Sequence, residues 1–112
     1  MFKIVKPESL LWPVTIDVPR TDGSGETDPH LIKVRYKYLG VKEWQDIING
    51  EGGDNDDRKV RDYVVGWADI SNDDGEIEFS QSNLDMLMDI PYMAIGINKG
   101  FFECQSGSRS KN

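Results

Sequence analysis

Two segments in the first third of the chain alternate apolar and polar residues with a period of two. The apolar positions are Trp12, Val14, Ile16 and Val18 in the first segment and Ile32, Val34, Tyr36 and Tyr38 in the second. Because successive side chains of a β-strand point to opposite faces, each segment predicts a strand with one buried face. Residues 19–30 between them are rich in Gly, Pro, Asp, Ser and Thr, which favour turns. The chain is therefore constrained to open with a long-looped antiparallel β-hairpin.

The period of the pattern changes at Gly40. The next apolar residues are Val41, Trp44, Ile47 and Ile48, a spacing that predicts a helix ending near residue 50. A second helix is predicted over residues 58–65, with Val60, Tyr63 and Val64 on one face and Gly66 at its end. Residues 67–70 and 76–79 flank the turn-like sequence SNDDG, which predicts a small central hairpin.

Two further helices are predicted in the last third of the chain. Ser80 or Ser82 can cap the helix over residues 83–90, and Pro91 suits the first turn of a helix that runs to Cys104. With a short strand possible at residues 2–5, the predicted fold class is α+β: an N-terminal antiparallel β-hairpin packed with about four short helices and a small central hairpin. We expect one domain over residues 1–104 and a disordered polar tail over residues 105–112.

Charge is distributed unevenly along the 112 residues, which carry a formal net charge of −7. Residues 43–89 hold fourteen acidic and three basic residues, whereas the segments on either side each have a net charge of +2. This balance argues against binding to nucleic acid or to an anionic membrane. It fits either a solvated acidic face or an acidic surface that meets a basic partner, including head-to-tail self-association with a basic end of another copy. The basic row Lys33, Arg35 and Lys37 fits cross-strand pairing with acids or a stripe that binds a polyanion.

Residues with catalytic or metal-binding chemistry are few. His30 lies in the predicted loop and Cys104 ends an apolar run, and nothing in the sequence brings them together. In a calcium-loop frame with Gly75 at position six, Ile70 and Gln81 occupy the two positions that require acids. One Cys and one His cannot supply the four ligands of a structural zinc site. We therefore expect a non-enzymatic protein with no cofactor. No apolar run suggests a signal peptide or a membrane span, so we expect a cytoplasmic location.

The second half of the chain carries an ordered set of residues that resembles a known family. Gly66-Trp67 is followed by a short acidic segment ending in Gly75, the step Phe79-Ser80, and a Leu-rich helix. The matching residues that follow are Leu84, Leu87, Pro91, Ala94 and Phe101. This order resembles the tail assembly chaperones of long-tailed phages. The resemblance covers residues 2–104 and is most specific from Gly66 to Leu87.

The resemblance implies a non-catalytic role in a phage or prophage. Such proteins bind the tape-measure protein and keep it soluble until tail tube protein polymerises around it. They act in the host bacterial cytoplasm, are absent from the mature virion, and often have a longer frameshifted product. Exposed apolar residues would bind the partner, and the candidates are Trp44, Tyr63, Trp67, Met86, Met88 and Met93. Two alternatives stay open: a structural minor tail or head–tail protein of the virion, and a small acidic inhibitor or nucleic-acid mimic.

Overall fold

The N-terminal hairpin is the framework of the fold. The computed structural model describes residues 1–49 and 60–107. Strand β1 (Ser9–Pro19) pairs antiparallel with β2 (Thr27–Lys37), in a register that runs from Ser9 opposite Lys37 to Pro19 opposite Thr27. The hairpin predicted from the alternation is confirmed, with strands longer than the apolar pattern alone indicated. His30 lies in β2 opposite Ile16 and not in the loop.

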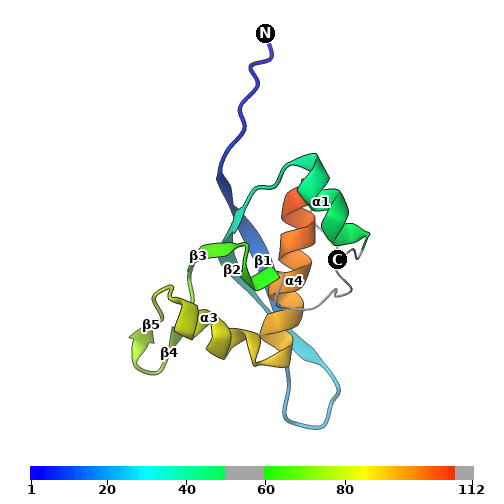
Figure 1. Cartoon of the computed structure of the whole chain (residues 1–112). Coiled ribbons are helices and arrows are strands. Elements are labelled where there is room, and N and C mark those ends of the chain that lie inside the picture. The colour runs from blue at the N-terminus through cyan, green and yellow to red at the C-terminus, as the bar shows by residue number, and fades with distance from the viewer. Residues whose placement is uncertain (50–59, 108–112) are drawn as a thin grey trace.

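A third strand takes the place of the C-terminal end of a predicted helix. Strand β3 (Val64–Ala68) pairs antiparallel with β2, so the sheet order is β1-β2-β3 (Figure 1). Of the helix predicted over residues 58–65, Val60 and Arg61 are helical, and residues 58 and 59 lie outside the described residues. The helix prediction for Val64 was wrong because a turn followed by a strand buries the same apolar residues. Consecutive β-branched residues at 64 and 65 favour the strand.

Three helices, and not about four, lie within residues 1–49 and 60–107. They are α1 (Val41–Ile48), α3 (Gln81–Met88) and α4 (Pro91–Ser106). Ser80, one of the two predicted caps, accepts a hydrogen bond of 3.0 Å at its Oγ from the backbone N–H of Asn83. Helix α4 begins at Pro91 as predicted but continues to Ser106, two residues beyond the expected domain end, and Gly107 follows in the left-handed conformation.

The small central hairpin exists but is shorter than predicted. Its strands are β4 (Ser71–Asn72) and β5 (Gly75–Glu76), and the N–H of Ile77 donates a hydrogen bond of 2.9 Å to the carbonyl oxygen of Ile70 just beyond them. Gly75 has a φ of 123°, a conformation that L side chains rarely adopt, so glycine is required at this turn. Trp67 and Ala68, which were expected in this hairpin, belong to β3 instead.

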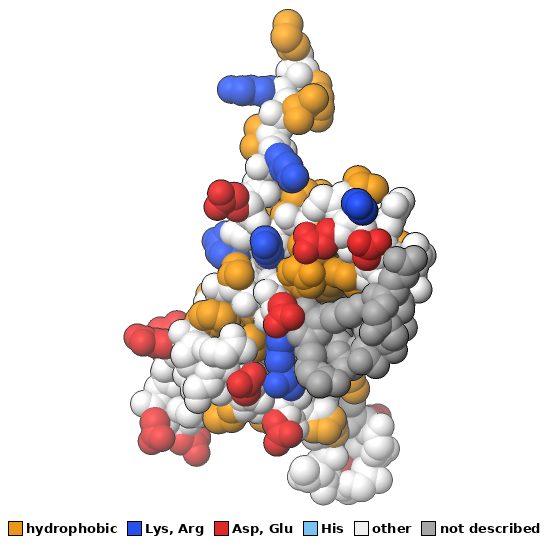
Figure 2. All heavy atoms as spheres, in the orientation of Figure 1, with side chains coloured by type: hydrophobic (Ala, Val, Ile, Leu, Met, Phe, Trp, Pro, Cys, Tyr) orange, Lys and Arg blue, Asp and Glu red, His pale blue; other side chains and the backbone are white. Residues whose placement is uncertain are grey.

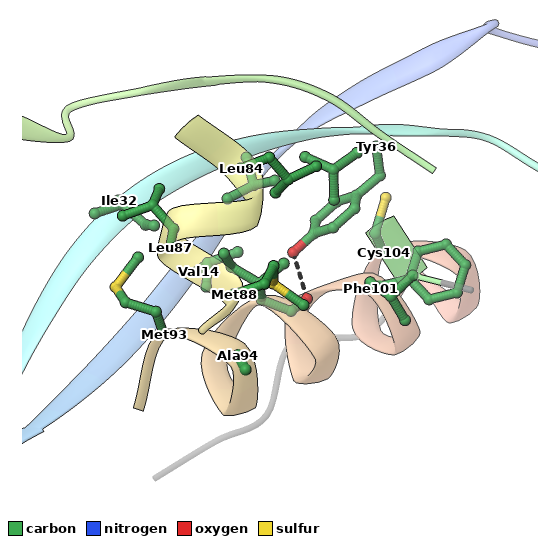
Figure 3. Close-up of a cluster of buried hydrophobic side chains, with 14 of the residues drawn as sticks. Val14, Ile32, Tyr36, Leu84, Leu87, Met88, Met93, Ala94, Phe101 and Cys104 are labelled. Carbon is green, nitrogen blue, oxygen red and sulfur yellow. Dashed lines mark hydrogen bonds between the residues drawn. The ribbon is translucent and has the colours of Figure 1, made fainter. Parts of the chain in front are cut away.

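Helices α3 and α4 contribute the layer that buries one face of the sheet. Figure 3 shows Tyr36 from β2 among Leu84, Met88 and Phe101, with its hydroxyl directed at α4. Helix α4 lies close to β1 because Gly96 and Gly100 have no side chains. A Cβ atom at Gly96 would collide with Ile16, and one at Gly100 would lie 2.5 Å from Cγ2 of Val14. The spacing of these two glycines therefore serves the packing of a helix on a strand.

Candidate functional site

One face of the sheet is left uncovered by the helices that the structure describes. Because side chains alternate along each strand, the even-numbered residues Val14, Ile16, Val34 and Tyr36 are buried beneath the helices, while the odd-numbered ones face away from them. The register places Leu11 opposite Arg35 and Thr15 opposite Leu31. Leu11 is 42% exposed and Leu31 is 58% exposed. We define the open face as Leu11, Leu31, Lys33, Arg35 and Lys37.

Within residues 1–49 and 60–107, no acid pairs with the basic residues of the open face. Their neighbours on β1 are Ser9, Leu11 and Pro13, and those on β3 are Gly66 and Ala68. Among the residues that the structure describes, Lys33, Arg35 and Lys37 form no ion pair, and Arg35 donates a hydrogen bond of 3.2 Å to the hydroxyl of Ser9. The predicted cross-strand pairing with acids is therefore wrong.

Other basic residues of the protein do have acidic partners. Arg20 lies 2.8 Å from Glu26 and 3.0 Å from Asp28, and Arg61 lies 3.1 Å from Asp85. The open face therefore combines exposed leucines with positive charge that no described acid pairs with. A surface of this kind can hold an apolar stripe that is flanked by carboxylates.

An open depression continues the open face toward the N-terminus. It has a volume of about 650 Å³, and its lining residues are Lys6, Pro7, Glu8, Ser9, Lys37, Tyr38 and Val65. Two of these residues are lysines and one is a valine that is 45% exposed. The depression therefore combines apolar surface with two lysines and one acid, Glu8.

The six residues predicted to bind a partner do not form one surface. Met88 and Met93 are buried in the core, which corrects their prediction as exposed contacts, whereas Met86 is 47% exposed. The other three are partly buried and packed against the core.

Trp44 and Tyr63 are partly buried and pack against Phe101. The ring of Trp44 lies 5.9 Å from that of Phe101, and the ring of Tyr63 stacks on Phe101 at 5.5 Å. The hydroxyl of Tyr63 donates a hydrogen bond of 3.1 Å to Glu43. Burial, together with this hydrogen bond and the nearby negative charge, raises the pKa of Tyr63. Both aromatic residues hold α1 and the start of β3 against α4.

Trp67 anchors the small hairpin through a hydrogen bond and a ring contact. Its Nε1–H donates a hydrogen bond of 2.8 Å to the carbonyl oxygen of Ile77, and its ring meets Phe79 edge-on at 5.0 Å. Since Ile77 directly follows β5, Trp67 ties the small hairpin to the main sheet. Gly66 was predicted to end a helix, but it lies within β3 opposite Arg35.

The residues considered for catalysis lack a suitable environment. Cys104 is fully buried, and burial raises the pKa of its thiol to about 11, so the reactive thiolate is disfavoured. His30 is exposed in β2. Within residues 1–49 and 60–107, no group of three or more His, Cys, Asp or Glu side chains is placed to hold a metal ion.

The sequence pattern indicated the basic row of β2 but not that Leu11 and Leu31 lie exposed on the same face of the sheet. All five residues of the open face occupy odd-numbered positions, Leu11 in β1 and the other four in β2. The strand considered for residues 2–5 is not formed, and this segment extends away from the sheet (Figure 1). In the part of the chain that the structure describes, no helix has the length and apolar character needed to cross a membrane. No protein-family model, curated protein or solved structure matches this chain.

Proposed function

We propose that this protein is a phage or prophage tail assembly chaperone, which binds the tape-measure protein and keeps it soluble while the tail tube forms. The observation that carries the proposal is the open face, where Leu11 and Leu31 are exposed among Lys33, Arg35 and Lys37. Exposed apolar side chains beside positive charge can form the contact surface for a partner, and the proposal assigns that role to the open face.

The expected partner segment is an amphipathic helix with acidic flanks. Its apolar stripe would cover the two leucines, and its carboxylates would pair with the three cations of the open face. Before the tail tube forms, a long helical tape-measure protein would expose such apolar stripes to water, and a chaperone would cover them. In this proposal the chaperone works in the host bacterial cytoplasm and is not retained in the virion.

The residues that carry the family resemblance support the proposal through their structural roles. Trp67 anchors the small hairpin, Gly75 forms its turn, and Ser80 caps α3. Each of these roles is structural and needs no catalytic group. They build the support behind the sheet, and the open face is then the surface left for binding.

The test is co-expression with the tape-measure protein encoded nearby, with its soluble fraction and its co-purification as readouts. The informative variants are Leu31→Asp and the triple variant Lys33→Glu/Arg35→Glu/Lys37→Glu, because all of these side chains are exposed and make little contact with the core. Each variant is expected to weaken binding by about tenfold or more, which corresponds to about 1.4 kcal/mol. Thermal unfolding should stay close to that of the wild type.

The matched control is Lys42→Glu/Lys99→Glu, which also reverses charge on exposed lysines but lies on α1 and α4. It should leave the tape-measure protein soluble. Precipitation of that protein with and without the wild-type chain would overturn the proposal. Detection of the chain in purified virions would favour the structural tail component, and salt-sensitive binding to a host enzyme would favour the acidic inhibitor.

A further inference from the structure

The N-terminal arm, residues 1–6, makes no use of its apolar side chains within its own copy. It extends beyond the sheet, and the first backbone contact that fixes the chain is the hydrogen bond of 2.9 Å from the N–H of Tyr38 to the carbonyl oxygen of Glu8 (Figure 1). Phe2 is 87% exposed, Ile4 is 82% exposed and Val5 is 74% exposed. Lys3 and Lys6 add two positive charges to the same six residues. The arm is therefore an extended apolar and basic segment with no partner among the residues that the structure describes.

A surface of opposite charge lies at another end of the molecule. Residues 62–98 contain eight acidic residues and no Lys, Arg or His. We define the acidic end as residues 69–79, which include the exposed acids Asp69, Asp73, Asp74, Glu76 and Glu78. None of these five forms an ion pair with any described residue. Figure 2 shows acidic side chains gathered around this part of the molecule, opposite the arm with its hydrophobic and basic side chains.

The acidic end also offers features that suit an extended peptide. Phe79 is exposed beside the hairpin, and Ile77 is half-buried. Strands β4 and β5 have two residues each and pair only with each other, so each has a free edge. A two-stranded hairpin is marginal in water and is strengthened by a third strand. An extended segment can supply that strand through its backbone and its specificity through its side chains.

We propose that the N-terminal arm of one copy binds the acidic end of a second copy. Lys3 and Lys6 meet the carboxylates of the hairpin, and Phe2 and Ile4 contact the apolar side chains at Phe79. Because the two surfaces are different and lie at opposite ends, the contact is head to tail and generates rings or open chains. This self-association uses neither the open face nor the tape-measure protein, so it goes beyond the proposed function and can be tested without it.

The experiment uses two full-length variants that each lose one of the two surfaces. The arm variant is Lys3→Glu/Ile4→Ser/Lys6→Glu, and the acid variant is Asp73→Asn/Asp74→Asn/Glu76→Gln. All six side chains are exposed, so the fold is expected to be retained, which circular dichroism checks. The control is Lys42→Glu/Lys99→Glu, which makes the same change in net charge as the arm variant. Mass is measured by light scattering across a concentration series at low and high salt.

The wild type and the control should increase in mass with concentration and decrease in mass with salt. Each variant alone should be a monomer of 12.7 kDa. An equimolar mixture of the two should give a dimer and nothing larger, because only one intact arm and one intact acidic end can meet. A wild type that stays monomeric at every concentration, an arm variant that associates like the wild type, or a mixture without dimer would each overturn the proposal. A wild-type chain that self-associates as expected but does not bind the tape-measure protein would count against the proposed function alone.

Discussion

The hydroxyl of Tyr36 donates a hydrogen bond of 2.6 Å to the backbone carbonyl oxygen of Ile97 and so joins the C-terminal end of β2 to the middle of α4 (Figure 3). Tyr36 is fully buried, and its ring lies edge-on to that of Phe101 at 5.8 Å. A buried hydroxyl without a partner would destabilise the fold, and this contact removes that cost. The carbonyl group of Ile97 is held in place by helix α4. The hydrogen bond from Tyr36 therefore fixes the position of α4 on the sheet.

Tyr36→Phe should lower the free energy of unfolding by about 1 kcal/mol, since the hydrogen bond is lost while the ring remains. Urea denaturation followed by circular dichroism measures the change. Tyr38→Phe is the control, because Tyr38 is only partly buried and no hydrogen bond of its hydroxyl is found among the described residues. Equal stability of Tyr36→Phe and the wild type would contradict the role assigned to this contact.

Gly96→Ala and Gly100→Ala should each destabilise the protein by about 1–3 kcal/mol, because the added methyl group forces α4 away from β1. At Gly96 it would also approach the backbone oxygen of Thr15 to 3.1 Å, and at Gly100 it would lie 2.6 Å from the hydroxyl of Tyr36. Gly66→Ala is the matched control, since its nearest neighbour would be Cβ of Arg35 at an ordinary 3.5 Å. Melting temperatures of all three variants decide the point, and a larger loss for the control would refute it.

Trp67→Phe should cost more than Trp12→Phe, by about 1 kcal/mol, because only Trp67 loses a hydrogen bond. Nε1 of Trp67 is bonded to Ile77, whereas Nε1 of Trp12 is buried without a partner among the described residues. Both tryptophans are partly buried in the same sheet. Paired denaturation curves give the difference, and faster amide exchange at the small hairpin is expected for Trp67→Phe alone. The opposite order would contradict the anchoring role.

Alkaline pH should destabilise the protein from about pH 9 upward. Burial raises the pKa of Cys104 from 9.0 to about 11 and raises that of Tyr36 well above its ordinary 10.0. The folded state therefore holds both protons more tightly than the unfolded state. This stabilisation is complete below pH 9 and is lost as pH rises toward and beyond 11, by about 1.4 kcal/mol per pH unit for each proton held only by the folded state. Urea denaturation at pH 8, 9 and 10 measures it, and Cys104→Ala should show a shallower decline between pH 9 and 10.

Local patterns carried much of the architecture. The alternation in residues 12–18 and 32–38 was enough for the hairpin, because a period of two has one geometric meaning in a strand. Pro91 marked the start of α4, since its missing N–H costs nothing in the first turn. Ser80 could be named as a cap of α3 because its hydroxyl can satisfy a free N–H there. These features depend on neighbouring residues, and the sequence contains the neighbours.

Other features depended on contacts between distant residues. Val60, Tyr63 and Val64 have helical spacing, yet Val64 belongs to β3. It pairs with Tyr36 at the edge of β2, which lies 28 positions earlier in the sequence. Met88 and Met93 entered the core while Met86 remained outside, since α3 and α4 pack on the sheet in one particular orientation. The open face exists for the same reason: the helices bury one side of the sheet, and the alternation that the sequence displays cannot say whether a second layer covers the other. By itself the sequence determined which residues share a face, and the tertiary packing decided which of those faces met water.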